Sequence, residues 1–273
     1  MTGGIERIVV ALDATAENRA AIGTAARLAA RWKAHLHGVF IEDDDLIRLA
    51  HLPFARQVTL GHGVETLTPQ QAERQMRAFA DRARRELAAA ARRRGVEWSF
   101  ETARGGVAGP VGAGSTRDFL VCATTTRPVD GHFRVECRWW STVEPGTTSY
   151  LLAQGEGGEG TVAALLQDRG PAAERLLEVT ARLAEAHGGR LAVICPPELA
   201  KTPGFKTWLD ACLAGQAVKV ELDLAPAEPA ALNRRIVELD CRVVALASGA
   251  AEAQPDRLRA MIAKIDCDVL VVR

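Results

Sequence analysis

The chain has 273 residues, which is long enough for two α/β domains that each bury a core of their own. Lysine plus arginine and aspartate plus glutamate both number 34, so the net charge is zero and no overall attraction to nucleic acid or to an anionic membrane is expected. No run of about 18 apolar residues is present, and residues 1–6 are not a signal peptide, so we expect a cytoplasmic protein.

Residues 7–40 are predicted to form a strand, a turn, a helix and a second strand. The hydrophobic run 8–12 ends at Asp13, an alanine-rich helix follows to about Trp32, and residues 36–41 are again apolar. Apolar strands that alternate with amphipathic helices are typical of parallel sheets covered on both faces. Ligands of such folds bind at the carboxyl ends of the strands, where the sequence places Asp13.

The rest of the first half continues this alternation less regularly. The acidic run 42–45 is interpreted as a solvated loop or helix start rather than a cation site. A long helical pattern covers 70–94 and should end at Gly95. The segment Gly105 to Thr116 superficially resembles a phosphate loop, but Ser115 occupies the position of the lysine. We interpret the segment as an irregular crossover between two strands and leave its role open. Strands are predicted at 96–102 and 119–123.

The first unit recurs in the second half of the chain. Asp168 aligns with Asp13 at an offset of 155 residues (168 − 13). At the same offset, Ala181-Arg182-Leu183-Ala184 aligns with Ala26-Arg27-Leu28-Ala29. Two aligned features at one offset predict a tandem repeat of one fold.

The repeat predicts two domains, 1–155 and 156–273, of unequal length. The second is shorter, because Cys267 aligns with Thr148 at an offset of only 119 residues (267 − 148). Much of the loss falls after Cys195. Elements of the second domain are predicted at 161–166, 171–187, 191–195, 218–222 and 243–247.

The cysteine and histidine patterns predict no catalytic or metal site. The six cysteines form no C-x-x-C pair or zinc spacing, and Cys122, Cys195 and Cys267 lie among aliphatic residues of predicted strands, which favours small core residues. His35 and His37 share one face of a strand without a third metal ligand. No histidine has a nucleophile or carboxylate at a recognisable spacing.

Short motifs at both ends of the chain resemble those of universal stress proteins. The segment Val10-Ala11-Leu12-Asp13-Ala14-Thr15 resembles the opening V-A-x-D-[GA]-[ST] turn of that family. The segment Cys267-Asp268-Val269-Leu270-Val271-Val272-Arg273 resembles its closing C-P-V-L-V-V strand, with Asp268 in place of proline. Residues 46–58 are similar to a stretch found in bacterial members. The resemblance covers nearly the whole chain, in a two-domain tandem form.

The resemblance implies a fold and a mode of pairing. Each domain would be a doubly wound, Rossmann-like parallel sheet of five strands, similar to the adenine nucleotide alpha hydrolases. Family members commonly pair through the last strand of the sheet. The two halves of this chain would then form an intramolecular pseudo-dimer.

Many family members bind ATP through the opening aspartate and a run of Gly, two residues, Gly, nine residues, Gly, then Ser or Thr. The glycines let backbone N–H groups surround the phosphates, and the following helix N-terminus adds positive potential. When the run is anchored on Ser141, the three glycine positions hold Arg127, Asp130 and Trp140. Trp140 would fill the space of the phosphate oxygens, and Asp130 would add a like charge.

The first half still offers candidate nucleotide-binding positions. Gly131 lies one residue late and could partly replace a glycine of the run, and Arg127 could attract an anion. In the second half no glycine follows Gly249, so the glycine run is missing there. Asp168 is the part of the ATP-binding motif that remains in this half. The candidate nucleotide-binding residues are Asp13, Thr15, Arg127, Gly131, Ser141 and Thr142.

From these observations we expect a cytoplasmic universal stress protein-like protein that acts in the stress response as a non-enzymatic regulatory or interaction protein. It would bind a protein partner or associate with itself, and no cofactor, metal, nucleic acid or membrane is expected. Two alternatives stay open. One is a sensor that binds ATP or another adenine nucleotide in the first domain, and the other is an enzyme of the wider adenine-binding α/β group.

Overall fold

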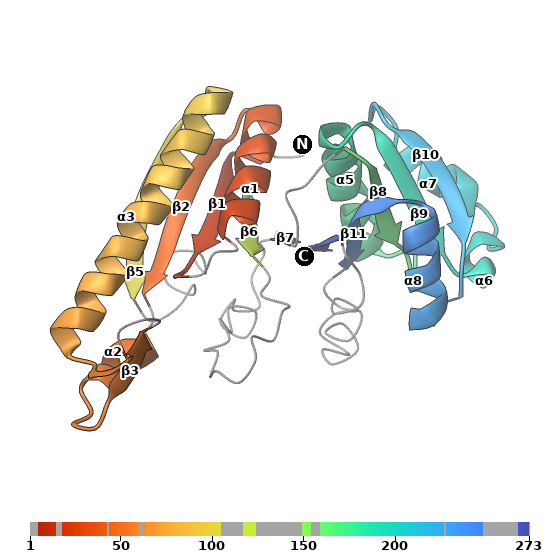
Figure 1. Cartoon of the computed structure of the whole chain (residues 1–273). Helices are drawn as coiled ribbons and strands as arrows, with labels where there is room; N and C mark the ends of the chain where they lie inside the picture. Colours follow the sequence, from red (N-terminus) through yellow and green to blue (C-terminus); the bar gives the residue numbers. More distant parts are fainter. Residues whose placement is uncertain are drawn as a thin grey trace.

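The computed structural model describes residues 5–14, 18–42, 44–59, 63–104, 117–123, 149–153, 159–226, 228–247 and 267–272. These residues form an α/β structure in which one sheet runs through both halves of the chain (Figure 1). None of the described helices combines the length and the apolar character needed to cross a lipid bilayer. The segment Gly105 to Thr116 lies outside the described residues.

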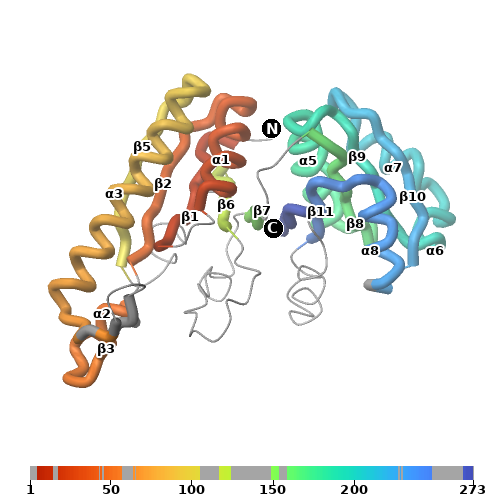
Figure 2. The backbone as a smooth tube through the Cα atoms, viewed as in Figure 1, coloured from red at the N-terminus to blue at the C-terminus, as the bar shows by residue number. Residues whose placement is uncertain are grey.

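Ten described strands form the sheet, in the order β10-β9-β8-β11-β12-β7-β6-β1-β2-β5. The backbone tube in Figure 2 shows the strands of the first half, red to green, beside those of the second half, green to blue. The mostly parallel, Rossmann-like α/β fold predicted from the sequence is thereby confirmed. The strands are β1 (Arg7–Leu12), β2 (His35–Glu42), β5 (Trp98–Arg104), β6 (Asp118–Ala123), β7 (Ser149–Ala153), β8 (Thr161–Leu165), β9 (Arg190–Cys195), β10 (Lys219–Leu224), β11 (Cys241–Ala247) and β12 (Asp268–Val272).

The two halves of the sheet meet where β7 lies antiparallel to β12, a pair that we call the seam. Leu151 is opposite Leu270, and Leu152 is opposite Val269. All the other neighbouring strand pairs described in this sheet are parallel. The hydrogen-bonded sheet is therefore continuous from one half of the chain to the other.

Helices pack on both faces of the sheet. Buried residues of α1, α3, α5 and α7 join the core on one face, and Ile236 of α8 joins the core on the other. Because side chains alternate along a strand, the seam contributes Leu151 and Leu270 to the first core, and Leu152 and Val269 to the second. Both cores therefore continue across the seam. The helices are α1 (Asn18–Trp32), α2 (Asp44–Ala50), α3 (Pro69–Arg94), α5 (Pro171–Ala186), α6 (Pro197–Ala200), α7 (Phe205–Cys212) and α8 (Pro229–Glu238).

Local sequence determines both ends of the long helix α3. Thr68 caps the first turn: its hydroxyl accepts a hydrogen bond from the Gln71 N–H, and the Gln71 side chain accepts one from the Thr68 N–H, with Pro69 at the first helical position. Gly95 ends the helix in the left-handed conformation, at φ 65°, which glycine adopts without steric cost. The predicted end at Gly95 is confirmed.

The two halves differ most in the connection that follows their second strand. In the first half, α2 and an antiparallel hairpin of β3 (Arg56–Thr59) and β4 (Gly63–Thr66) precede the 26-residue helix α3. In the second half, only the short helices α6 and α7 stand between β9 and β10. The predicted loss of length after Cys195 is confirmed. We call the extra segment of the first half, residues 44–66, the arm.

Candidate functional site

The turn that follows β1 is held by the side chain of Asn18, the first residue of α1. Its Oδ1 accepts a hydrogen bond of 3.2 Å from the Asp13 N–H, and its Nδ2 donates one of 2.5 Å to the Asp13 carbonyl oxygen. Asn18 is buried. Since an asparagine at a helix start readily bonds to nearby backbone, this pair fixes Asp13 at the carboxyl end of β1. This role of Asn18 was not predicted from the sequence, although an asparagine five residues after the aspartate is a usable signal.

Of the candidate nucleotide-binding residues, the structure places only Asp13. It lies at the carboxyl end of a strand between β2 and β6, as the sequence predicted. The other candidates lie outside the described residues, so the structure does not test whether they come together with Asp13. They are Thr15, Arg127, Gly131, Ser141 and Thr142.

A carboxylate and a guanidinium group form an ion pair at this edge of the sheet. Glu42 ends β2 and Arg104 ends β5, and the two form an ion pair with 2.5 Å between Oε2 and Nε. The pKa of Arg104 is raised, first by its hydrogen bond to Glu42 and further by the charges of Glu73 and Asp44. The guanidinium group of Arg104 is therefore already paired with a carboxylate at this edge.

In the second half, Asp168 has a different role from Asp13. Its Oδ1 accepts a hydrogen bond of 2.9 Å from the Gly170 N–H, and so closes the turn that leads into α5. The neighbouring Arg169 donates to the carbonyl oxygen of Pro203 at 2.9 Å and lies 5.6 Å from the ring centre of Trp208. These contacts fasten the turn to the α6–α7 segment, which is a structural role for the repeated aspartate.

Four of the five described cysteines are buried, and Cys212 is partly buried. Cys122, Cys195 and Cys267 are all buried, which confirms their interpretation as core residues. Burial and the charges of Asp240 and Asp223 raise the pKa of Cys241 to about 12, so this thiol stays protonated at neutral pH. It therefore does not provide a thiolate nucleophile.

His35 and His37 both contact the side chain of Ser99. His35 Nε2 and His37 Nδ1 each lie 2.7 Å from the Ser99 hydroxyl oxygen. Burial lowers the pKa of His35, with the nearby His37 acting in the same direction. Across the part of the chain that the structure describes, no three His, Cys, Asp or Glu side chains are grouped to hold a metal ion.

An ion pair fastens α8 to the outer strand β10 in the second half. Arg235 binds Asp223 through two hydrogen bonds of 2.7 Å each, from Nε and Nη2, and also contacts Glu238. Its pKa is raised, chiefly by the hydrogen bond to Asp223. Asp223 is buried and α8 lies beside it, so this pair positions the helix on the sheet rather than forming an open site.

Comparisons with known proteins identify the fold. No family model matches the sequence, and no curated protein is significantly similar to it. Among solved structures, a universal stress protein from Archaeoglobus fulgidus has a TM-score of 0.67 at 11% identity, covering 99% of this chain and 97% of its own. A functionally unknown protein from Pseudomonas aeruginosa has a TM-score of 0.60 at 16% identity, covering 98% of this chain and 92% of its own.

A second Pseudomonas aeruginosa protein, provisionally named a universal stress protein, has a TM-score of 0.58 at 16% identity and covers 98% of this chain and 93% of its own. These matches extend over both halves of the chain rather than over one. At such low identities they establish the architecture and not a shared site. The chain therefore has the fold of the universal stress proteins, in its tandem form.

Proposed function

We propose that this chain is a universal stress protein-like protein of the cytoplasm that acts without catalysis, by binding another protein in the stress response. The fold that it shares with the Archaeoglobus fulgidus universal stress protein supports the assignment to this family. The observation that carries the interaction role is the apolar surface of the arm.

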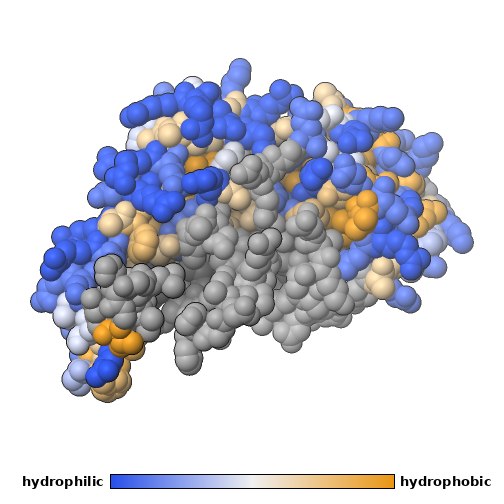
Figure 3. Space-filling model, in the orientation of Figure 1, coloured by the Kyte–Doolittle hydropathy of each residue, from blue (hydrophilic) through white to orange (hydrophobic). Residues whose placement is uncertain are grey.

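The arm exposes large apolar side chains at one end of the molecule. Leu49, Leu52, Phe54 and Val64 are exposed by 47, 42, 73 and 60%, respectively. Figure 3 shows hydrophobic atoms at the lower left, where Figure 1 places α2 and β3. Aromatic and aliphatic groups that gather on one projecting surface are typical of protein-binding sites.

The sheet itself does not require the arm. The second half completes its five strands with only α6 and α7 in the corresponding connection. The arm packs on the start of α3 through a small cluster of its own, formed by Ala50, Ala55, Leu67 and Ala72. An attached element that contributes little to the main core, and yet exposes apolar side chains, is best explained by a partner that covers them.

An adenine-nucleotide sensor in the first half is the second candidate function. It is favoured by one observation, the position of Asp13 at the carboxyl end of β1, where Asn18 holds the turn. In that role Asp13 would act together with Thr15, Ser141 and Thr142.

We expect substitutions in the arm to abolish partner binding without unfolding the protein. The test is chemical cross-linking in stressed cells followed by recovery of the chain, with the double variant Phe54→Asp and Val64→Asp. Because both side chains are exposed, the variant should keep the wild-type melting temperature and lose the cross-linked partner.

Val237→Asp is the matched control, since Val237 is 75% exposed but lies on α8, in the other half of the chain. This variant should recover the partner as the wild type does. Sedimentation velocity of the purified chain shows whether the partner is a second copy. Equal recovery by wild type, arm variant and control would contradict the proposed role of the arm.

A further inference from the structure

A serine, a histidine and a carboxylate are connected in series on β2 and β5, near the opposite end of the strands from Asp13. His37 is the third residue of β2, and Ser99, the second residue of β5, lies directly opposite it. His37 Nδ1 is 2.7 Å from Ser99 Oγ, and His37 Nε2 is 3.3 Å from Glu101 Oε1. A base that contacts a hydroxyl group and is itself oriented by a carboxylate is the arrangement that activates serine as a nucleophile.

These side chains lie on the face of the sheet opposite α1 and α3. Leu36 of β2 belongs to the core beneath those two helices, and because side chains alternate along a strand, His37 projects from the other face. β5 is the outermost strand on its side of the described sheet (Figure 1). Ser99 and His37 are partly buried, and the side chain of Glu101 is 48% exposed. The serine hydroxyl is therefore shielded without being enclosed.

The contacts determine which nitrogen of each histidine carries the proton. A carboxylate only accepts hydrogen bonds, so the neutral ring of His37 has its proton on Nε2, facing Glu101, and Nδ1 is left as an acceptor. The Ser99 hydroxyl has one hydrogen atom, which it donates to His37 Nδ1. His35 Nε2, 2.7 Å from the same oxygen, must then donate to it. His37 is thus placed to accept the serine proton, and His35 is not.

The charges beside the serine favour an uncharged reactant. Burial is the first cause that lowers the pKa of His35, so this ring is neutral at neutral pH and adds no positive charge. The charge of Glu97 also acts on His35, and Glu101 belongs to the series itself. Arg7 lies nearby but donates two hydrogen bonds, of 3.0 and 2.5 Å, to Asp118. The two glutamates would repel a phosphate dianion, whereas a neutral acyl group meets no such repulsion.

We propose that Ser99 is an activated nucleophile and a site of acylation by neutral activated esters or thioesters. Ser99 Oγ attacks the carbonyl carbon while the hydroxyl proton passes to His37 Nδ1. The bond from the carbonyl carbon to the leaving oxygen or sulfur then breaks, the leaving group takes the proton from His37, and Ser99 remains as an ester. Glu101 positions His37 and offsets the positive charge that the ring carries between the two proton transfers.

The reaction consumes one acyl group per chain and is a modification rather than a turnover. It therefore goes beyond the proposed binding role without replacing it. The spacing of residues in the sequence could not show this site, because Ser99 follows His37 by 62 residues and meets it only through the pairing of β2 with β5.

A serine that merely bridges two histidines, and so holds β5 to β2, would have the same contacts. The two roles differ in what they require of the histidines. A bridge depends on both rings alike, whereas activation depends on His37 as the base. His35→Gln is therefore the matched control for His37→Gln, because the two positions lie on one strand and glutamine keeps an N–H donor in place of His35.

The test is the reaction of the full-length protein with p-nitrophenyl acetate, followed by nitrophenolate absorbance and by peptide mass spectrometry. The wild type should release about one equivalent of nitrophenolate per chain in a burst and carry the acetyl group on Ser99. Ser99→Ala should lose the burst. His37→Gln should slow acylation at least about a hundredfold, the lower value for a general base, and His35→Gln should keep most of the rate.

Glu101 is tested as a positioning residue that acts through His37. Glu101→Gln should slow acylation, and the double variant with His37→Gln should be no slower than His37→Gln alone. A further loss of rate in the double variant would contradict this series of contacts. Melting curves of each variant confirm that the fold is intact.

The proposal is overturned if Ser99 carries no acetyl group, or if His35→Gln slows acylation as much as His37→Gln does. Continued release of nitrophenolate beyond the burst, lost in Ser99→Ala, would show that the ester is hydrolysed. That result would support the activated serine and would contradict the non-catalytic role proposed for the chain, so the two proposals can fail separately.

Discussion

Leu270→Ala should lower the free energy of unfolding of the whole chain by about 2 to 5 kcal/mol, the usual cost of truncating a fully buried leucine. Leu270 is fully buried and lies directly opposite Leu151 in the seam. Both side chains belong to the core that continues from α1 in the first half to α5 in the second. The cavity would therefore weaken both halves, and they should still unfold in a single transition.

Hydrogen exchange measured by mass spectrometry distinguishes this result from a local effect. In Leu270→Ala, the amides of β1 and of β8 should lose protection together, because the seam couples the halves. Leu222→Ala is the control: this leucine is 43% exposed on the outer strand β10, and its truncation should cost about 1 kcal/mol or less. Loss of protection confined to the second half would contradict a cooperative seam.

Phe119→Ala is the second substitution with a large expected effect. Phe119 is buried near the start of β6, and its ring meets Trp32 of α1 edge to face, with 5.2 Å between centroids and 85° between planes. Truncation of a buried phenylalanine costs about 3 to 5 kcal/mol, to which the aromatic pair adds about 0.5 to 1.5 kcal/mol. Denaturant unfolding of the purified variant measures this loss.

The consequence should extend to the contact between the halves, because Trp32 Nε1 donates to the Arg182 carbonyl oxygen of α5 at 3.4 Å. When Phe119 no longer supports the indole ring, the fluorescence of Trp32 should shift towards that of a solvated tryptophan. Phe54→Ala serves as the control, since Phe54 is 73% exposed on the arm and its truncation should change stability by about 0.5 kcal/mol or less. Equal destabilisation by the two substitutions would contradict the described packing.

The sequence predicted the repeated strands and helices for two reasons. The spacing of apolar residues indicates each element, and the recurrence of the same elements in the second half indicates the repeat. The apolar strand predicted at 36–41 is β2, and the long helix ends at Gly95 as expected. The repeat aligned Cys267 with Thr148 at an offset of 119 residues (267 − 148). Strand β7 begins at Ser149 and β12 at Asp268, so the two strands are related by the same offset (268 − 149 = 119). In each case the residues that define the element lie within it or directly beside it in the chain.

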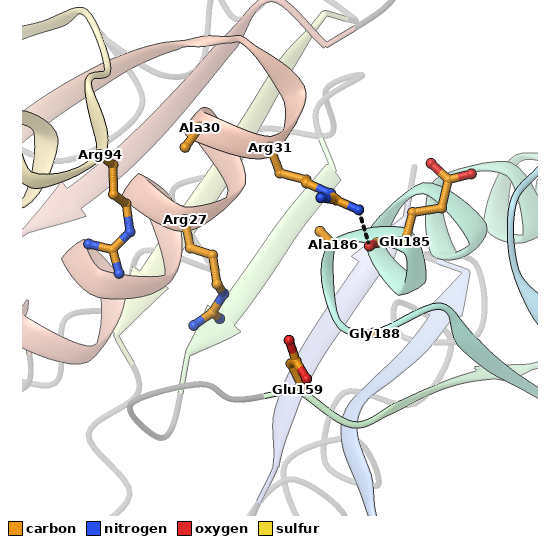
Figure 4. Close-up of a pocket in the computed structure, with 8 residues that line it drawn as sticks. All are labelled: Arg27, Ala30, Arg31, Arg94, Glu159, Glu185, Ala186 and Gly188. Atoms are coloured by element: carbon orange, nitrogen blue, oxygen red, sulfur yellow. Dashed lines mark hydrogen bonds between the residues drawn. The ribbon is translucent and has the colours of Figure 1, made fainter.

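Features made by residues from separate segments could not be predicted in this way. The hairpin of β3 and β4 has four residues in each strand, too few for an alternating pattern to be recognised. The register of the seam depends on two edges that are far apart in the chain. The hollow between the two halves is lined by the ends of α1, α3 and α5 and by the chain before β8 (Figure 4), which no local sequence pattern connects.

At the candidate nucleotide site, the sequence predicted the place of Asp13 but not the group that holds it. Strand ends in parallel sheets meet at one edge, so a motif at the end of an apolar run is enough to position the aspartate. The two hydrogen bonds from Asn18 depend on the exact course of the turn, which periodicity does not determine. The ion pair of Glu42 with Arg104 was missed for the same reason, since the two residues belong to different strands.

If the chain acts without a nucleotide at Asp13, the purified protein should contain no nucleotide and should bind none there. The measurement is a thermal-shift titration with ATP, ADP and AMP, beside chromatography of any small molecule released from the heat-denatured protein. A ligand at a thousand times its dissociation constant stabilises a fold by about 4 kcal/mol, which a melting curve resolves.

We expect no nucleotide to be released and no stabilisation by AMP. Any shift caused by ATP should persist in Asp13→Ala, because it would arise away from the turn that follows β1. The contrary result is one released nucleotide per chain, together with a shift by ATP, ADP and AMP that disappears in Asp13→Ala. That outcome would replace the interaction role with that of a nucleotide sensor.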